Sequence, residues 1–163
     1  MKKLILISLL AAAAAAAQTE PTLYEQMGGE PKMRAIAEEF TRVLLADERT
    51  NFTFAETDLQ KFTQLFYEQL SEVTGGPVKY TGRSMRESHD KLNITNEMFN
   101  ALVEDLYIAF ERNDVPYRLQ NKVMAVFAPM QRDIVKPGAA NAARALPPTP
   151  PPPPPPPSAP PGS

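Results

Sequence analysis

Apolar residues recur at helical spacing through the middle of this 163-residue chain, and no other feature constrains its fold as strongly. The clearest example runs from Asn96 to Arg112, where one face carries Phe99, Leu102, Val103, Leu106 and Phe110. Similar stripes cover Pro31–Leu45, Asp58–Val73 and Leu119–Ile134, with a bend expected at Pro129. Because β signals are scarce between these segments, the pattern predicts an all-α domain.

Glycine pairs separate several of the predicted helices. Gly28-Gly29 precedes the Pro31 helix, and Gly75-Gly76 follows the Asp58 helix. Glycine at such breaks favours positive φ or a close approach of two segments. Thr95 stands directly before the Asn96 helix and is expected to cap it. We therefore expect short helices that cross sharply.

Both ends of the chain differ from this middle. Lys2, Lys3, an apolar run and alanines up to Ala17 form the pattern of a secretory signal peptide (residues 1–17). The alternative is a membrane anchor, for which the apolar stretch is short. Residues 137–163 are proline-rich and are expected to be a disordered spacer, or else a ligand for a proline-recognising groove. Residues 18–136 then form the domain of a periplasmic or secreted protein, with no membrane span after cleavage.

The residue counts exclude several classes of site. The chain has no cysteine, which excludes disulfides and cysteine-bound iron–sulfur clusters. It has a single histidine, so a metal site can use only one imidazole from this chain. The net charge of -2, with mixed signs, gives no indication of nucleic acid or anionic membrane partners.

The single histidine, His89, lies in a polar, weakly patterned stretch between Gly76 and Asn96. Apolar helices around such a stretch suggest a large apolar object in the middle of the domain. Haem is such an object, and its iron commonly takes one axial histidine. His89 is then the candidate ligand. Candidates for an apolar pocket are Phe40, Phe52, Phe54, Phe62, Phe66 and Phe127. The alternative is an ordinary surface histidine above a simple aromatic core.

The order of several short motifs resembles the group I truncated haemoglobins. The motifs are Leu23-Tyr24-Glu25-Gln26-Met27-Gly28-Gly29, Phe40 with Val43-Leu44-Leu45-Ala46-Asp47, Phe54, Gly75-Gly76-Pro77, Tyr80-Thr81-Gly82, Met85, His89 and Ile94-Thr95. Each motif is weak alone, but their order and spacing together are specific and cover Thr22 to Val135. The resemblance implies an abbreviated globin fold, a two-over-two helical sandwich around haem b.

The same resemblance implies roles for individual residues. His89 takes the place of the proximal ligand to the iron and is the only metal ligand expected from the chain. The other haem-contacting positions fall on Phe54, Phe62, Phe66, Met85, Val123 and Phe127, with Val126 beside them. The distal ligand pocket falls on Phe40, Thr41, Phe62, Phe66 and Leu70.

The distal positions depart from the pattern of the family. Many members carry tyrosine where this chain has Thr41, and often glutamine where it has Phe62 or Phe66. Those groups donate hydrogen bonds to oxygen, which phenylalanine cannot do. We therefore expect a weaker hold on oxygen, unless Gln64, Tyr67 or Gln69 compensates.

Three functions remain open from the sequence. The first is reversible binding of oxygen, carbon monoxide or nitric oxide, for transport, sensing or scavenging. The second is a nitric oxide dioxygenase or peroxidase-like enzyme of the cell envelope, which needs an unidentified reductase because no flavin or nicotinamide site is visible. The third is a helical interaction module without haem.

Overall fold

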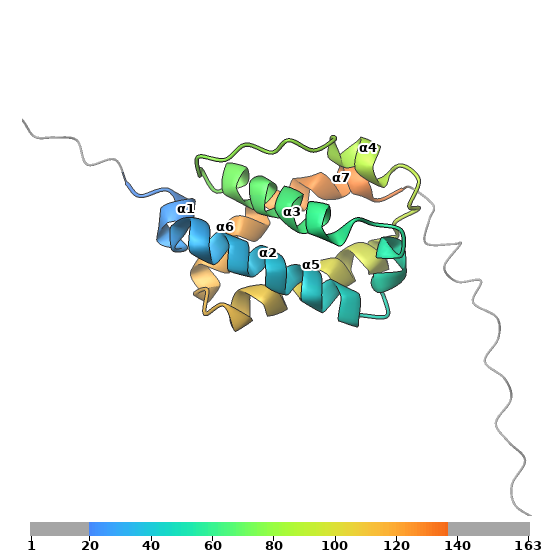
Figure 1. Ribbon diagram of the computed structural model, residues 1–163, viewed down its shortest axis with the longest axis horizontal. Coiled ribbons are helices and arrows are strands. Elements are labelled where there is room, and N and C mark those ends of the chain that lie inside the picture. The colour runs from blue at the N-terminus through green and yellow to red at the C-terminus, as the bar shows by residue number, and fades with distance from the viewer. Residues whose placement is uncertain (1–19, 137–163) are drawn as a thin grey trace, which may run out of the picture.

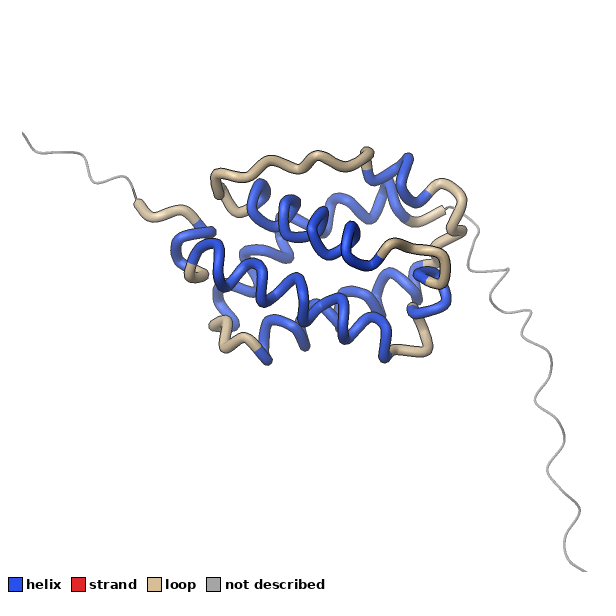
Figure 2. Tube along the Cα trace, viewed as in Figure 1, coloured by secondary structure: helices blue, strands red, loops and turns tan. Residues whose placement is uncertain are grey.

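The structure, a computed structural model, describes residues 20–136, which form helices joined by turns (Figures 1 and 2). The helices are α1 (Leu23–Gln26), α2 (Gly29–Ala46), η1 (Asn51–Phe54), α3 (Leu59–Val73), α4 (Met85–His89), α5 (Asn96–Arg112), α6 (Tyr117–Phe127), η2 (Ala128–Met130) and α7 (Gln131–Ile134), where η1 and η2 are 3-10 helices. No strand occurs between residues 20 and 136, so the all-α prediction is confirmed. The predicted signal peptide (1–17) and tail (137–163) lie outside the described residues.

The helices cross in two layers. Helix α2 packs against both α3 and α5, and Figure 1 shows α2 and α3 in the nearer layer with α5, α6 and α7 behind them. At the crossing with α5, Met33, Ile36 and Phe110 are 0% exposed. This arrangement matches the two-over-two helical sandwich that the motif resemblance implies.

Side-chain caps fix where two of the predicted helices begin. The Asp58 carboxylate accepts a hydrogen bond from the Lys61 amide (3.0 Å), and α3 starts at the next residue. The Thr95 hydroxyl accepts one from the Met98 amide (3.2 Å), so the predicted cap of α5 is confirmed. Each cap satisfies a backbone donor that has no partner within the helix.

The sequence predicts one helix over Leu119–Ile134 with a bend at Pro129, but the structure has a break there. Helix α6 begins two residues earlier, at Tyr117, and ends at Phe127 before the turn η2 and the short helix α7. Pro129 lacks the amide hydrogen that would continue the helix, so the chain tightens into a 3-10 turn there. Val126, inside α6, is 40% exposed and does not line the cavity described below, so it does not close a pocket as expected.

Three glycines adopt a backbone conformation that other residues rarely reach. Gly28 and Gly29, at the start of α2, have φ 102° and 67°, and Gly75, just after α3, has φ 82°. These values confirm the breaks predicted from the glycine pairs. Within residues 20–136, no helix combines the length and apolar character needed to cross a membrane.

Candidate functional site

A cavity of about 740 Å³ lies between α3, α4, α5 and the C-terminal helices. Phe99 and Tyr80 line the cavity, and five further phenylalanines of its lining form an aromatic wall: Phe40, Phe54, Phe62, Phe66 and Phe127. These rings contact one another, with centroid distances of 4.4 Å for Phe40–Phe66, 5.0 Å for Phe54–Phe62 and 6.1 Å for Phe66–Phe127. Pockets for small molecules and cofactors measure roughly 300–1,000 Å³ and are mostly apolar. The cavity therefore has the size and lining of a cofactor site.

His89 reaches this cavity from the end of α4. The Ser84 hydroxyl and the Glu87 carboxylate form a capping box that starts the helix, and the single helical turn ends at His89 itself. The His89 Nδ1 atom lies 2.7 Å from the Met85 carbonyl oxygen, which can only accept, so Nδ1 carries the proton. Nε2 is then the nitrogen left with a lone pair for a metal.

Partial burial favours the neutral form of the His89 imidazole. The loss of water around the ring lowers its pKa below the usual value, and the hydrogen bond to the Met85 carbonyl offsets this only in part. A metal ligand must present an unprotonated nitrogen. The ring therefore has the protonation state that an axial ligand requires.

The structure brings together most of the residues predicted for the site. His89, Phe40, Phe54, Phe62, Phe66, Met85 and Phe127 all line the cavity. Thr41, Leu70 and Val123 do not: each is buried in the packing between helices, at 9%, 0% and 0% exposure. Neighbouring residues point about 100° apart on a helix, so Phe40 faces the cavity while Thr41 faces α3. For the same reason Met124, and not Val123, reaches the cavity.

Phe52 does not join the aromatic wall. It lies in η1 but is 60% exposed and is absent from the cavity lining.

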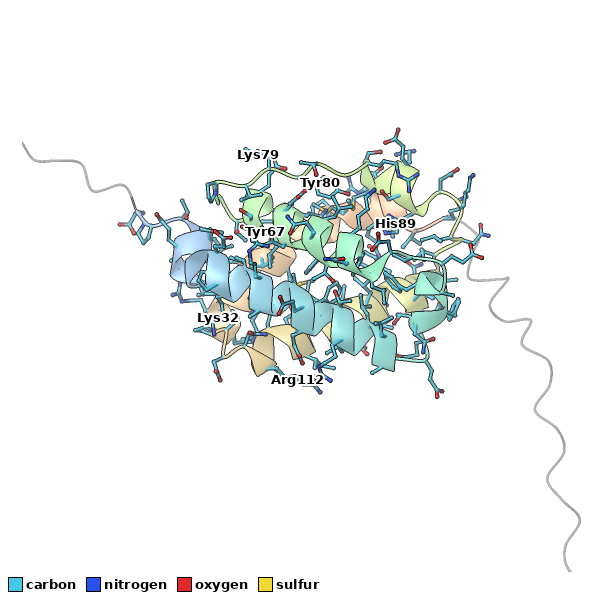
Figure 3. All side chains as sticks on the ribbon, in the orientation of Figure 1. Lys32, Tyr67, Lys79, Tyr80, His89 and Arg112 are labelled. Carbon is cyan, nitrogen blue, oxygen red and sulfur yellow. The ribbon has the colours of Figure 1, made fainter. Side chains whose placement is uncertain are left out.

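In Figure 3, His89 and Tyr80 lie on the upper side of the molecule, whereas Lys32 and Arg112 lie at the opposite edge.

Most hydroxyl groups around the cavity are directed into the protein; the exception is the exposed Thr57, which lines the cavity and whose hydroxyl forms no hydrogen bond within residues 20–136. Thr41 Oγ1 bonds to the Ala37 carbonyl oxygen (2.9 Å) and to Thr63 Oγ1 (2.8 Å). On the cavity wall itself, the hydroxyls of Thr50, Thr53, Tyr80, Thr81 and Ser88 all donate to backbone carbonyls or carboxylates. A hydroxyl has one proton, so these groups have none to spare for a ligand in the cavity.

The three alternative donors have different positions. Gln69 lines the cavity, with its Nε2 3.4 Å from Met85 Sδ and 3.5 Å from Met130 Sδ. Tyr67 is 2% exposed beneath the Arg34 guanidinium and lies outside the cavity. Gln64 lies on the outer surface and bonds to Glu68. Gln69 is thus the one of the three that reaches the cavity.

Several cavity residues were not predicted from the sequence. Lys61 and Arg83 line the wall, and neither forms an ion pair within residues 20–136. Met98, Met124 and Met130 add thioether surface. Lys61 lies next to the apolar stripe of α3 in the sequence, so its position beside the cavity could have been predicted from the helical spacing. Arg83 lies in a segment without periodicity, and no sequence signal marked it.

Glu68 is a further residue that the periodicity did not single out. Its carboxylate is 8% exposed and accepts hydrogen bonds from the Thr81 amide (3.0 Å) and the Thr81 hydroxyl (2.6 Å). The bonds from Thr81, and a third from Gln64, lower the pKa of Glu68, so it remains an anion. Next to Thr81, Gly82 packs so closely on the Tyr80 ring that a Cβ atom has no room. Glu68 therefore ties the wall segment Tyr80–Arg83 to α3.

Comparison with known proteins decides the family. The model of the bacterial-like globin family matches residues 22–136, which is nearly all of the described chain. This chain belongs to the bacterial-like globins. Its relatives include the group 1 truncated haemoglobin of Tetrahymena pyriformis, which is 32% identical over 114 residues (70% of this chain and 94% of the relative). That of Synechocystis is 35% identical over 109 residues (64% and 88%).

Solved structures of truncated haemoglobins have the same fold as this globin. The Fe(III) form from Tetrahymena pyriformis gives a TM-score of 0.69 at 32% identity, covering 72% of this chain and 100% of the other. The Synechococcus protein in the cyanomet state with covalently attached haem gives 0.66 at 29% identity, covering 71% and 98%. The predicted resemblance to group I truncated haemoglobins and the two-over-two fold are both confirmed.

Haem b is accordingly the cofactor of this globin, and the cavity fits it. The aromatic wall offers apolar surface for the macrocycle, and the one imidazole of the chain lines the same cavity with its Nε2 available. Haem b also carries two propionate carboxylates, for which Lys61 and Arg83 supply cations at the wall. The residues of the cavity therefore match the apolar macrocycle, the iron and the propionates of haem b.

Proposed function

We propose that this globin reversibly binds a diatomic gas at a haem iron held by His89, and that it holds oxygen weakly compared with carbon monoxide and nitric oxide. The observation that carries this proposal is the aromatic wall, in which Phe40, Phe62 and Phe66 line the same cavity as His89. When bound, haem supplies the iron that takes the gas. The protein supplies the imidazole on one side and an apolar surface on the other.

The wall around the gas determines which ligand stays. Oxygen held at a ferrous haem would carry partial negative charge and would be stabilised by a hydrogen-bond donor, whereas carbon monoxide would benefit much less. The hydroxyl of Thr41 is engaged with Ala37 and Thr63, and phenylalanine has no donor. A net hydrogen bond contributes roughly 0.5–1.5 kcal/mol. Its absence is expected to make oxygen release about tenfold faster, at roughly 1.4 kcal/mol per decade.

Gas dissociation rates test this proposal. Absorption spectra of the ferric, ferrous and carbon monoxide forms first report haem content and coordination. Stopped-flow mixing then gives the dissociation rates of oxygen and carbon monoxide, and we expect fast release for oxygen only. Slow release of oxygen would show that a donor such as Gln69 reaches the ligand. Sustained consumption of nitric oxide with an added reductant would instead favour the dioxygenase alternative.

We also propose that the mature protein begins near Gln18 and functions in the periplasm or outside the cell. The support is the sequence alone: a basic start at Lys2 and Lys3, an apolar run, and an alanine-rich segment before Gln18. N-terminal sequencing of the protein from an envelope fraction provides the test. A first residue of Met1 in that fraction would contradict cleavage.

A further inference from the structure

Helix α4, which carries His89, lacks the usual means of stabilising a helix. It has five residues, Met85–His89, and none of them is buried. Isolated helices of this length are unstable in water, and helices in proteins depend chiefly on an apolar face. Met85, Ser88 and His89 are half-buried toward the cavity, so the contacts that fix the position of α4 from outside are its capping box and polar contacts with neighbouring segments.

Two ion pairs join this helix to the C-terminal segment. Arg86 on α4 pairs with Asp133 on α7, and Asp90, directly after α4, pairs with Lys136 (3.3 Å). The Lys136 amide also donates to the Ile94 carbonyl oxygen (3.2 Å), which fastens the chain beyond His89. Figure 1 shows α4 and α7 lying side by side at one end of the molecule. His89 lies between the two pairs in the sequence.

The polarity of the two pairs specifies one register. Along α4 the order is cation and then anion, and along the C-terminal segment it is anion and then cation. If α4 slid by one turn in one direction, Asp90 would face Asp133. If it slid in the other direction, Arg86 would face Lys136. Both shifts place like charges together, which is unfavourable, so the charges select the observed position.

We propose that Asp133 and Lys136 are positioning residues for His89, because their opposite charges lock the register of α4 and thereby aim the imidazole into the haem cavity. This inference rests on the proposed role of His89 as iron ligand. Each pair is largely exposed, with side-chain exposures of 76% and 45% for Arg86–Asp133 and 39% and 67% for Lys136–Asp90. Exposed pairs contribute little to global stability, so the effect is expected at the haem and not in overall unfolding.

A charge swap in the full-length haem-loaded protein tests the proposal. The variants are Arg86→Asp, Asp133→Arg and the double variant, which restores an ion pair with reversed polarity. We expect either single variant to release haem to a haem-free acceptor globin about fivefold faster, which corresponds to about 1 kcal/mol at 1.4 kcal/mol per decade. The double variant is expected to return to within about twofold of the original rate, and salt should reduce the difference among the three.

A matched control and a second readout separate positioning from general effects. Glu104→Arg reverses the same charge in an exposed ion pair with Arg49 (2.7 Å) that does not involve α4, and it should leave haem release within about twofold. The iron–histidine stretching band of the ferrous protein in resonance Raman spectra should shift or broaden in the single variants and recover in the double variant.

Two results have distinct meanings. If the unmodified protein shows no iron–histidine band, the proposed ligand is wrong. If the band is present but unchanged in both single variants, or if the double variant loses haem as fast as they do, the register lock is wrong while the ligand stands.

Discussion

The two walls of the haem cavity are built in opposite ways. Helix α3 has fifteen residues, and Phe62 and Phe66 belong to the apolar face that it packs against the core. Helix α4 has five residues, no buried side chain, and contacts made by caps, ion pairs and the sulfur of Met85. Burial of a large apolar side chain contributes about 1.5–3 kcal/mol, whereas an exposed ion pair contributes about 0–1 kcal/mol.

This difference predicts a division of roles between the walls. The α3 wall is fixed by packing, so its side chains can change the affinity for different gases without moving the helix. The α4 wall is fixed by weak polar contacts, so changes there should act on haem retention. The predictions below test each half of this division.

His89→Gly should have the largest effect, because it removes the only imidazole of the chain. We expect the purified variant to lose most of its haem absorption and to regain part of it when free imidazole is added. Ser88→Gly is the matched control, since it places glycine in the same turn of α4 and keeps the ligand. A His89→Gly protein with an unaltered histidine-ligated spectrum would disprove the assignment.

Asp105 is a buried carboxyl on α5, outside the cavity lining, and removal of its charge should change stability. This carboxyl is 1% exposed, and burial together with the nearby Asp47 charge raises its pKa to about 6. The usual value is about 3.9, so folding favours the protonated form and stability falls as the pH rises from about 4 to about 6. Above that range the cost is constant.

The substitution Asp105→Asn should remove this cost because it keeps the shape without the charge. We expect the variant to be about 1–3 kcal/mol more stable than the original protein at pH 8, with a smaller advantage at pH 5. Urea unfolding at both pH values measures this difference. Glu104→Gln, at the neighbouring position with a side chain 60% exposed, should show no such gain. An equal gain at both pH values would mean that the carboxyl does not titrate as proposed.

Phe62→Gln tests the α3 wall, since it places an amide donor on the cavity surface. The new hydrogen bond should slow oxygen dissociation by about tenfold and change carbon monoxide dissociation by less than about twofold. Phe62→Leu is the control, because it alters the side chain without adding a donor. Stopped-flow rates for both gases decide the matter. If the two variants release oxygen at the same rate, position 62 does not face the bound gas.

The same contrast between the walls explains what the sequence could predict. Helical spacing reflects burial of one face, so α5 was predicted at both ends and α3 to within one residue. Helix α4 has no fully buried side chain and left no periodic signal, so His89 was singled out only as the one histidine of the chain and by the motif resemblance. Spacing also does not report how far a helix is rotated. The motif resemblance placed Thr41 and Val123 in the pocket, and spacing could not show that their neighbours Phe40 and Met124 line it instead.

The smallest effect is expected from removing the proline-rich end of the chain. A cut after Ala145 deletes Leu146 and a segment that is mostly proline, which has few backbone donors and no apolar face to pack on the domain. The free energy of unfolding should change by less than about 0.5 kcal/mol, and haem release by less than about twofold. A cut after Met130 is the contrasting variant, because it also removes Asp133 and Lys136 and should release haem at least as fast as Asp133→Arg. Equal, large losses from both cuts would mean that the tail itself supports the domain, and that the weak wall of the cavity depends on more than its two ion pairs.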